Sequence, residues 1–340
     1  MALAARRTLG RQLRADEFSG GAQTNSVLKA LGFVVRRCSC GGHVLGSAAS
    51  TRASSPTQGR TVGIRRRVTI LRLVTKGPPV DEPAVGEKLL RQTFKQAWPA
   101  NLITKFVITP GGFIQAPWPD DLVVHRAWKS RSAELRPLLA HAEAVLRSVV
   151  TRRVLLAAKG KAKILTIGID LRGGPKNSQA EFVAVYDVDR AKLVGWTGKS
   201  YPTPRQERSL VQVVDVETHL MHLAGERTLV LGCHDLNMFS PRARANQAAR
   251  GERRRRSNAM RDAVRDFQPT VVLQHPHDTD TPNIWRMPWL SLARDFPSVR
   301  TWASGIAYGS GYKRARLDRV LALTKSDERE VVDLVLATAP

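Results

Sequence analysis

The chain has 340 residues, 42% of them hydrophobic, which is enough for the core of one large domain or two ordinary ones. Its three cysteines, Cys38, Cys40 and Cys233, are too few for a disulfide framework, so we expect a reducing, cytoplasmic location. No apolar run approaches the roughly 18 residues of a membrane span, and we expect no membrane-spanning segment. The net charge of +25 favours an anionic partner such as nucleic acid, although biased codon usage also produces arginine-rich chains.

The N-terminal segment differs from the rest of the chain. Residues 1–67 contain twelve Lys or Arg and only two acids, Asp16 and Glu17, and they lack hydrophobic periodicity. An organellar transit peptide, a flexible arm, or sequence translated upstream of the true start would each have this composition. We expect residues 1–67 to be a disordered basic arm and residues 68–340 to be a single large α/β domain that could divide near residue 160.

Hydrophobic periodicity predicts alternating strands and helices from residue 68 onward. In chain order, the first predicted strands are 68–75, 102–109, 153–158 and 163–171, and the first predicted helices are 85–98 and 133–150. The last of these strands, at residues 164–170, and a strand at 181–186 flank a turn-rich loop. Strands at 318–324 and 331–337 flank a charged loop. Both pairs are therefore expected to be antiparallel. A helix is expected over residues 207–224. The predicted fold is a mixed parallel and antiparallel sheet flanked by helices.

Two apolar runs end in clusters of histidine and aspartate. Thr228–Leu231 runs into the first cluster and Thr270–Gln274 into the second, and both runs are typical of buried strands. Because ligands of open α/β sheets bind at the carboxyl ends of the strands, the two clusters are expected to face one cleft. Together they offer His234, Asp235, Asn237, His275, His277, Asp278 and Asp280.

Imidazole and carboxylate groups in this arrangement suit a divalent metal ion, Mg²⁺, Mn²⁺ or Zn²⁺, and the hydrolysis of a phosphoester in nucleic acid or a nucleotide. The predicted metal ligands are Asp235, His275, His277, Asp278 and Asp170, and the predicted catalytic residues are Asp235, His234 and His277. The alternative is that aspartate and asparagine at strand ends only cap helices and form turns.

A basic segment follows the first cluster. Residues 242–267 are rich in arginine and could form a phosphate-binding rim or a solvated helix. The predicted substrate-binding residues are Asn237, Arg242, Arg253 and Arg254.

Two other motifs are given structural interpretations. Asp215, His219 and His222 would share one face of the helix expected there. They could ligate zinc, but polar residues opposite an apolar stripe are typical of a surface helix, and we favour that interpretation. The stretch Gly195–Ser200 ends like a phosphate-binding P-loop but lacks its first glycine, and it is interpreted as a turn. Lys199 could contact an anion there, though nothing in the sequence requires it.

Short stretches resemble two families of phosphoesterases. Asp235-Leu-Asn237, followed by Arg316–Leu321, resembles the second half of the endonuclease/exonuclease/phosphatase family, which would imply metal-assisted phosphodiester cleavage. His234 replaces that family's usual glycine, and Glu328 stands where it has a terminal histidine. Gly232–Asp235 with His275-Pro-His277 is similar to elements of calcineurin-like metallophosphoesterases, whose opening Asp-x-His is missing. Each resemblance covers a handful of residues, and we assign the chain to neither family.

Two hypotheses from other classes remain. The chain could be a non-catalytic nucleic-acid-binding protein that uses its arginine-rich segments. Alternatively, Cys233 could be a nucleophile with His234 or His275 as its base, although a buried cysteine at a strand end is usually inert packing.

Overall fold

The computed structural model describes residues 66–77, 80, 82–120, 122, 129–130, 135–241, 251–309, 315–327 and 329–337. The expected arm over residues 1–67 lies almost entirely outside the described residues, and the boundary at residue 68 stays a prediction. Within the described part, no helix is long and apolar enough to cross a membrane.

The larger of two sheets is mixed, as predicted. Its centre is made of β1 (Arg66–Lys76), β2 (Leu102–Ile108), β5 (Ala162–Gly174) and β6 (Ser178–Asp187). β1, β2 and β5 are parallel, whereas β5 and β6 form the predicted antiparallel pair. The remaining strands of this sheet are β3 (Ile114–Pro117), β4 (Lys129–Ser130), β7 (Lys192–Gly198), β8 (Leu210–Val213), β13 (Ile306–Tyr308) and β14 (Val331–Ala337).

The smaller sheet carries both predicted clusters. Its order is β12 (Thr301–Ser304), β11 (Val271–Gln274), β10 (Glu226–Leu231) and β9 (Leu220–Leu223). β10, β11 and β12 are parallel, so the loops after β10 and β11 leave the sheet at the same edge. This adjacency brings the two clusters together.

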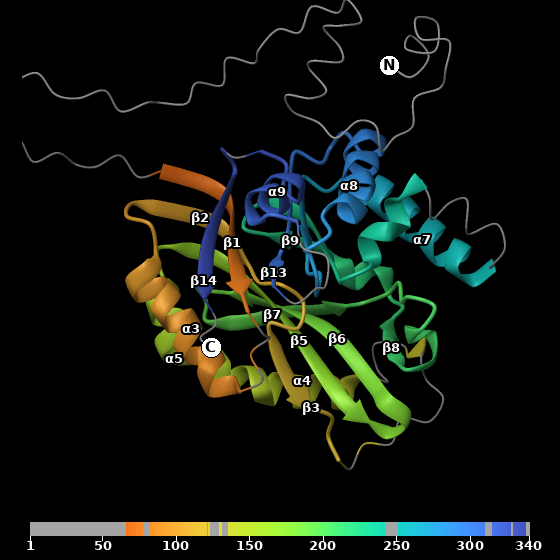
Figure 1. Ribbon diagram of the computed structural model, residues 1–340, viewed down its shortest axis with the longest axis horizontal. Helices are drawn as coiled ribbons and strands as arrows, with labels where there is room; N and C mark the ends of the chain where they lie inside the picture. Colours follow the sequence, from red (N-terminus) through yellow and green to blue (C-terminus); the bar gives the residue numbers. More distant parts are fainter. Residues whose placement is uncertain are drawn as a thin grey trace, which may run out of the picture. The chain divides into compact units, whose positions relative to one another are not determined.

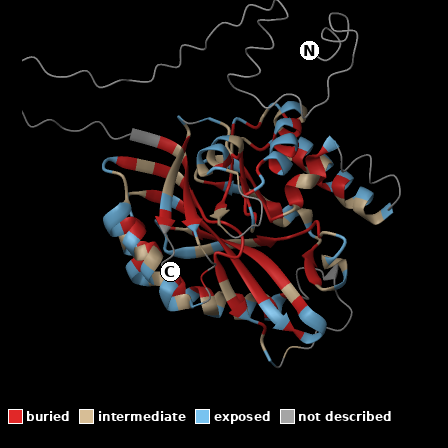
Figure 2. Cartoon of the chain, viewed as in Figure 1, coloured by how far each residue is buried: buried red, intermediate tan, exposed pale blue. Residues whose placement is uncertain are grey.

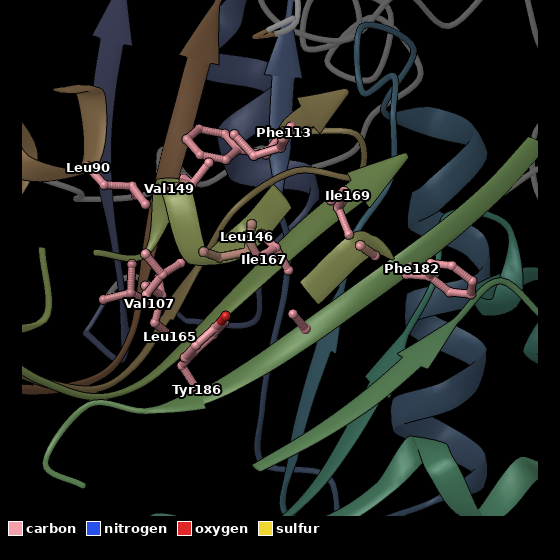
Figure 3. Close-up of a cluster of buried hydrophobic side chains, with 14 of the residues drawn as sticks. Leu90, Val107, Phe113, Leu146, Val149, Leu165, Ile167, Ile169, Phe182 and Tyr186 are labelled. Carbon is pink, nitrogen blue, oxygen red and sulfur yellow. The ribbon is translucent and has the colours of Figure 1, made fainter. Parts of the chain in front are cut away.

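The elements form four layers (Figure 1). One face of the larger sheet is covered by α3 (Pro83–Gln92), α4 (Arg136–Val149) and α5 (Arg152–Ala158), and Figure 3 shows part of the apolar core between them. The other face packs on the smaller sheet through a core that includes Phe106 and Val183 from one sheet and Val230 and Leu273 from the other. The smaller sheet's outer face is covered by α7 (Gly251–Phe267) and α8 (Asn283–Asp295). Most buried residues lie in the strands and on the inner faces of the helices (Figure 2).

The helices predicted over 85–98 and 133–150 and most of the predicted strands are confirmed, and three other predicted elements differ. Residues 153–158 belong to helix α5, which begins where the Thr151 hydroxyl accepts a hydrogen bond from the Val154 amide. Residues 318–324 belong largely to helix α9 (Leu317–Leu323), so the expected C-terminal hairpin is wrong, and β14 instead lies parallel to β1. Residues 207–224 form β8, β9 and short 3-10 turns rather than a helix. The runs 153–158 and 318–324 are short enough to fit either period, whereas residues 207–224 are divided among short strands and 3-10 turns despite their helical spacing.

Candidate active site

Five functional side chains meet at the edge where the two sheets face each other. Cys233 and His277 follow β10 and β11 of the smaller sheet. Asp170 and Glu181 are directly paired on β5 and β6 of the larger sheet, and Lys199 follows β7. Among the described residues, only one group of three metal-ligand side chains has its atoms within 4.8 Å of one another, and it consists of Glu181, Cys233 and His277.

The Cys233 thiol lies in a positively charged setting. Cys233 is 4% exposed, and its Sγ accepts a hydrogen bond from the backbone N–H of His277 at 3.4 Å. Burial alone would raise the pKa of this thiol. The positive charges of His234, Lys199 and His277 outweigh burial and hold the pKa well below its ordinary value. This setting favours the thiolate, which is the nucleophilic form of cysteine.

Lys199 and Glu181 form a buried ion pair beside the thiol. The Lys199 ammonium lies 3.0 and 2.9 Å from the two carboxylate oxygens of Glu181, and its side chain is 1% exposed. Burial disfavours its charge, but Cys233 and Glu181 together raise the pKa of Lys199 above its ordinary value. Burial also raises the pKa of Glu181, which accepts a further hydrogen bond from Gln206 at 2.9 Å.

His277 and Asp170 form a second buried pair. Nε2 of His277 lies 2.9 Å from each carboxylate oxygen of Asp170, and Arg172 also contacts that carboxylate at 2.9 Å. Burial opposes both charges. The pKa of Asp170 is nevertheless lowered by His277 and Arg172, and the pKa of His277 is raised well above its usual range by Asp170, Glu181 and Cys233.

Asp235 holds the backbone around the site. Its carboxylate accepts hydrogen bonds from the backbone N–H groups of Ser200, Tyr201 and Gly232 at 2.8, 2.7 and 2.9 Å, and the residue is fully buried. The loop after β10 is thereby tied to the loop after β7, which places Cys233 beside Lys199. A Cβ at Gly232 would lie 2.8 Å from the Lys199 Cα, so only glycine allows this approach.

The other residues of the second cluster lie apart from the thiol chemistry. His275 is fully buried, and neither of its ring nitrogens has a hydrogen-bond partner among the described residues. Asp278 is exposed and accepts a hydrogen bond from the Asp280 amide, whereas the Asp280 carboxylate accepts one from the Gly309 amide. Asp278 therefore has the turn-forming role that the sequence offered as the alternative, whereas the Asp280 carboxylate ties its loop to Gly309.

The remaining predicted residues of the first cluster and the basic segment surround the site at varying depth. His234 packs edge-on against Trp285, and Asn237 lies half-buried in a 3-10 turn. Arg253 pairs with Glu207 and stacks over the Tyr201 ring. Of the other two predicted substrate-binding residues, Arg254 is exposed and Arg242 lies outside the described residues.

The three polar residues expected on one helix face are separated. Asp215 caps a 3-10 turn by accepting a hydrogen bond from the Glu217 amide, and His222 is exposed on β9. His219 is fully buried and bonded to Thr197, Ser200 and the Val230 carbonyl. The exposed position that a surface helix implies for His219 is therefore wrong.

The predicted divalent metal ion is also wrong. Of the predicted ligands Asp235, His275, His277, Asp278 and Asp170, only the Asp170 and His277 side chains contact each other. The Asp235 carboxylate is hydrogen-bonded to backbone amides, and the Glu181 carboxylate is paired with the Lys199 ammonium. The set that does converge contains a thiol, a carboxylate, an ammonium and an imidazole, which is suited to nucleophilic catalysis.

Sequence reasoning missed Glu181 and gave Lys199 no defined role. Glu181 stands at the start of an otherwise apolar predicted strand, where a buried acid needs a partner. The sequence marks Lys199 only as the end of an incomplete P-loop motif. In the structure the Lys199 ammonium is paired with Glu181 of the same chain.

No protein-family model and no curated protein matches this sequence. Solved structures of an amidase from Nesterenkonia sp. AN1, described as a member of the nitrilase superfamily, are similar in fold to this chain. A variant with its cysteine replaced by alanine is 14% identical, with 75% of this chain and 82% of that chain covered and a TM-score of 0.43. The variant with serine in place of the same cysteine is 15% identical, with 73% and 79% covered and a TM-score of 0.41. Another crystal structure of an amidase from Nesterenkonia sp. is 13% identical, with 76% and 82% covered and a TM-score of 0.40.

The predicted metal-dependent phosphoesterase or nuclease does not agree with the geometry of the site and is wrong. Its metal ligands do not converge, and a thiol-centred cluster stands in their place.

Proposed function

We propose that this chain is a cysteine-dependent hydrolase that cleaves the C–N bond of amides, with Cys233 as the nucleophile. The observation that carries the proposal is the Cys233 thiol held beside the Lys199–Glu181 pair and His277, with its pKa well below the ordinary value. A thiolate in contact with proton donors is the arrangement that acyl transfer to sulfur requires.

The Cys233 thiolate attacks the carbonyl carbon of the substrate, and the electron pair of the carbonyl moves onto its oxygen. The Lys199 ammonium supplies a buried positive charge next to that developing oxyanion, where low solvent exposure strengthens the interaction. Collapse of the intermediate breaks the C–N bond and leaves a thioester on Cys233. Water then hydrolyses the thioester and restores the thiolate.

The charge of the site supports an amide substrate rather than an activated ester. An amine leaves only when it is protonated, whereas an activated alcohol leaves without help. Cys233 has two cationic proton donors as neighbours, Lys199 and His277, both with raised pKa values. The 23% exposed ring of His277 is the most accessible side chain of the cluster beside the thiol, so the substrate is expected to enter past it.

The test is ammonia release from a panel of small aliphatic and aromatic primary amides, combined with mass spectrometry of the protein. Wild-type protein should release ammonia and carry an acyl group on Cys233 during turnover, and Cys233→Ala should do neither. A Cys38→Ser, Cys40→Ser double variant is the matched control, because it removes the other thiols and should behave like wild type. Full activity in Cys233→Ala, or no turnover and no acylation with any amide, would refute the proposal.

We also propose a compartment and an anionic partner for the chain. A reducing compartment such as the cytoplasm suits a nucleophilic thiolate, because oxidation would inactivate it. An anionic partner at the basic segment around Arg253 and Arg254 is independent of the thiol chemistry, and a binding titration at increasing salt would test it.

A further inference from the structure

The His277 imidazole is oriented by groups from several elements. Nε2 faces both oxygens of Asp170, at 2.9 Å each, and Asp170 is itself fixed by Arg172 two residues further along β5. The other nitrogen, Nδ1, lies 3.5 Å from Glu181 Oε2, and His277, Glu181 and Cys233 offer ligand atoms within 4.8 Å of one another. One nitrogen is thus bonded to Asp170, and the other faces Glu181.

The loop between β2 and β3 closes over this ring. A Cβ at Gly112 would lie 3.0 Å from the His277 Cδ2 and 2.8 Å from an Asp170 oxygen, and one at Gly111 would lie 3.1 Å from the His277 Cε1. Gly112 also has a φ of +57°, which favours glycine. The imidazole therefore has backbone packed against its edge and cannot swing away from Asp170 without moving that loop.

Glu181 is less free than His277 to carry protons. Both of its carboxylate oxygens lie within 3.0 Å of the Lys199 ammonium, and one also accepts a hydrogen bond from Gln206. Among the described residues, the Nδ1 atom of His277 has no comparable hydrogen bond, and its nearest acidic neighbour is the Glu181 oxygen at 3.5 Å.

We propose that His277 is the catalytic acid and base of the reaction and that Asp170 is its positioning residue, so that Cys233, His277 and Asp170 act as one relay. This inference rests on the proposed function and assigns its proton transfers.

In the acylation step, the S–C bond forms and the C–N bond breaks, while Nδ1–H of His277 gives its proton to the departing nitrogen. Ammonia leaves from a primary amide, and His277 becomes neutral. In the deacylation step, His277 takes a proton from the attacking water as the C–O bond forms and the S–C bond breaks. The carboxylic acid leaves, and the thiolate and the imidazolium are restored.

The charged groups around His277 support this assignment. Asp170 and Arg172 come from β5, Glu181 from β6 and Lys199 from the loop after β7, while Cys233 and His234 follow β10 and His275 shares its loop. Burial opposes the imidazolium, yet Asp170, Glu181 and Cys233 raise its pKa well above the usual value. These neighbours favour the imidazolium, which is the form that can act as the acid.

The test uses Asp170→Asn, which keeps the size of the side chain and removes its charge. The rate of Cys233 alkylation by iodoacetamide and the value of kcat for an amide are both measured against pH. Without the carboxylate, the imidazolium is lost at lower pH, so the alkaline limb of kcat should move to lower pH. The pH at which the thiolate forms should move upward toward the value near 8.5 of free cysteine. KM should change little, because Asp170 does not touch substrate.

His277→Gln should lower kcat by about 10²–10⁴-fold, the usual contribution of a general acid and base. Added imidazole should restore part of the activity of a His277→Ala variant. Asp187→Asn is the matched control, because this carboxylate lies on β6 in an ion pair with Arg190 and should leave both profiles unchanged.

The relay and the proposed function fail in different ways. If Asp170→Asn has the alkylation and kcat profiles of wild type, the relay is refuted even though amides are cleaved. If no amide is cleaved, the proposed function is refuted. In that case the pH dependence of Cys233 alkylation still tests whether Asp170 and His277 influence the thiol. If Asp170→Asn has the same pH dependence as wild type, the coupling of Asp170 and His277 to Cys233 is refuted as well.

Discussion

Replacement of Asp235 should test stability rather than metal binding. Its carboxylate accepts three backbone hydrogen bonds in a fully buried position, at 2.7 to 2.9 Å. Asp235→Ala leaves three buried N–H groups without an acceptor, and each such group costs about 1–3 kcal/mol. Even at the lower end, the free energy of unfolding should fall by about 3 kcal/mol.

The measurement is equilibrium unfolding in urea followed by tryptophan fluorescence, since Trp285, Trp289 and Trp302 lie in or against the core next to the Asp235 loop. Asp235→Asn should be intermediate, because one oxygen still accepts from Ser200 and Tyr201 while an NH₂ group faces the Gly232 amide. Asp278→Ala is the matched control. Its exposed carboxylate makes a single local hydrogen bond, and its loss should cost at most about 1 kcal/mol.

A loss below about 1 kcal/mol in Asp235→Ala would refute the reasoning, because three buried donors cannot lose their acceptor so cheaply. Equal losses in Asp235→Ala and Asp278→Ala would also contradict it.

Three further predictions follow from the same contacts. Burial lowers the pKa of His275 from 6.5 to about 3, so the unfolded chain binds the extra proton and stability should fall as pH drops from 6.5 toward 3. In His275→Leu, the loss of unfolding free energy between pH 6.5 and pH 3 should be smaller by about 3–5 kcal/mol. Urea unfolding at several pH values measures this loss, and a pH dependence equal to that of wild type would contradict the prediction. Gly232→Ala should lower the free energy of unfolding by about 1–3 kcal/mol and slow Cys233 alkylation, because its Cβ would clash with the Lys199 backbone. Gly251→Ala is the control, because its Cβ would meet only the end of a side chain at 3.6 Å, and it should change neither quantity. Amide cleavage should survive EDTA and be abolished by iodoacetamide, and a loss of activity in chelator would contradict the thiol mechanism.

The sequence alone determined the fold class and the edge of the smaller sheet at which to look for a site. The apolar runs ending at Leu231 and Gln274 are long enough to be strands, and parallel neighbours bring their carboxyl ends together. Cys233 and His277 are therefore recognisable as candidates from the sequence, because local patterning places them directly after those strands.

Only the tertiary structure decided which chemistry the site carries. Glu181 and Lys199 reach the thiol because β5, β6 and β7 form an antiparallel meander whose end packs against the smaller sheet, a long-range arrangement that no local spacing records. Asp235 has the appearance of a metal ligand in the sequence, yet three backbone N–H groups use its oxygens in the folded chain. Side-chain type is a local property, whereas the partners that fix its charge and role are brought together only by folding.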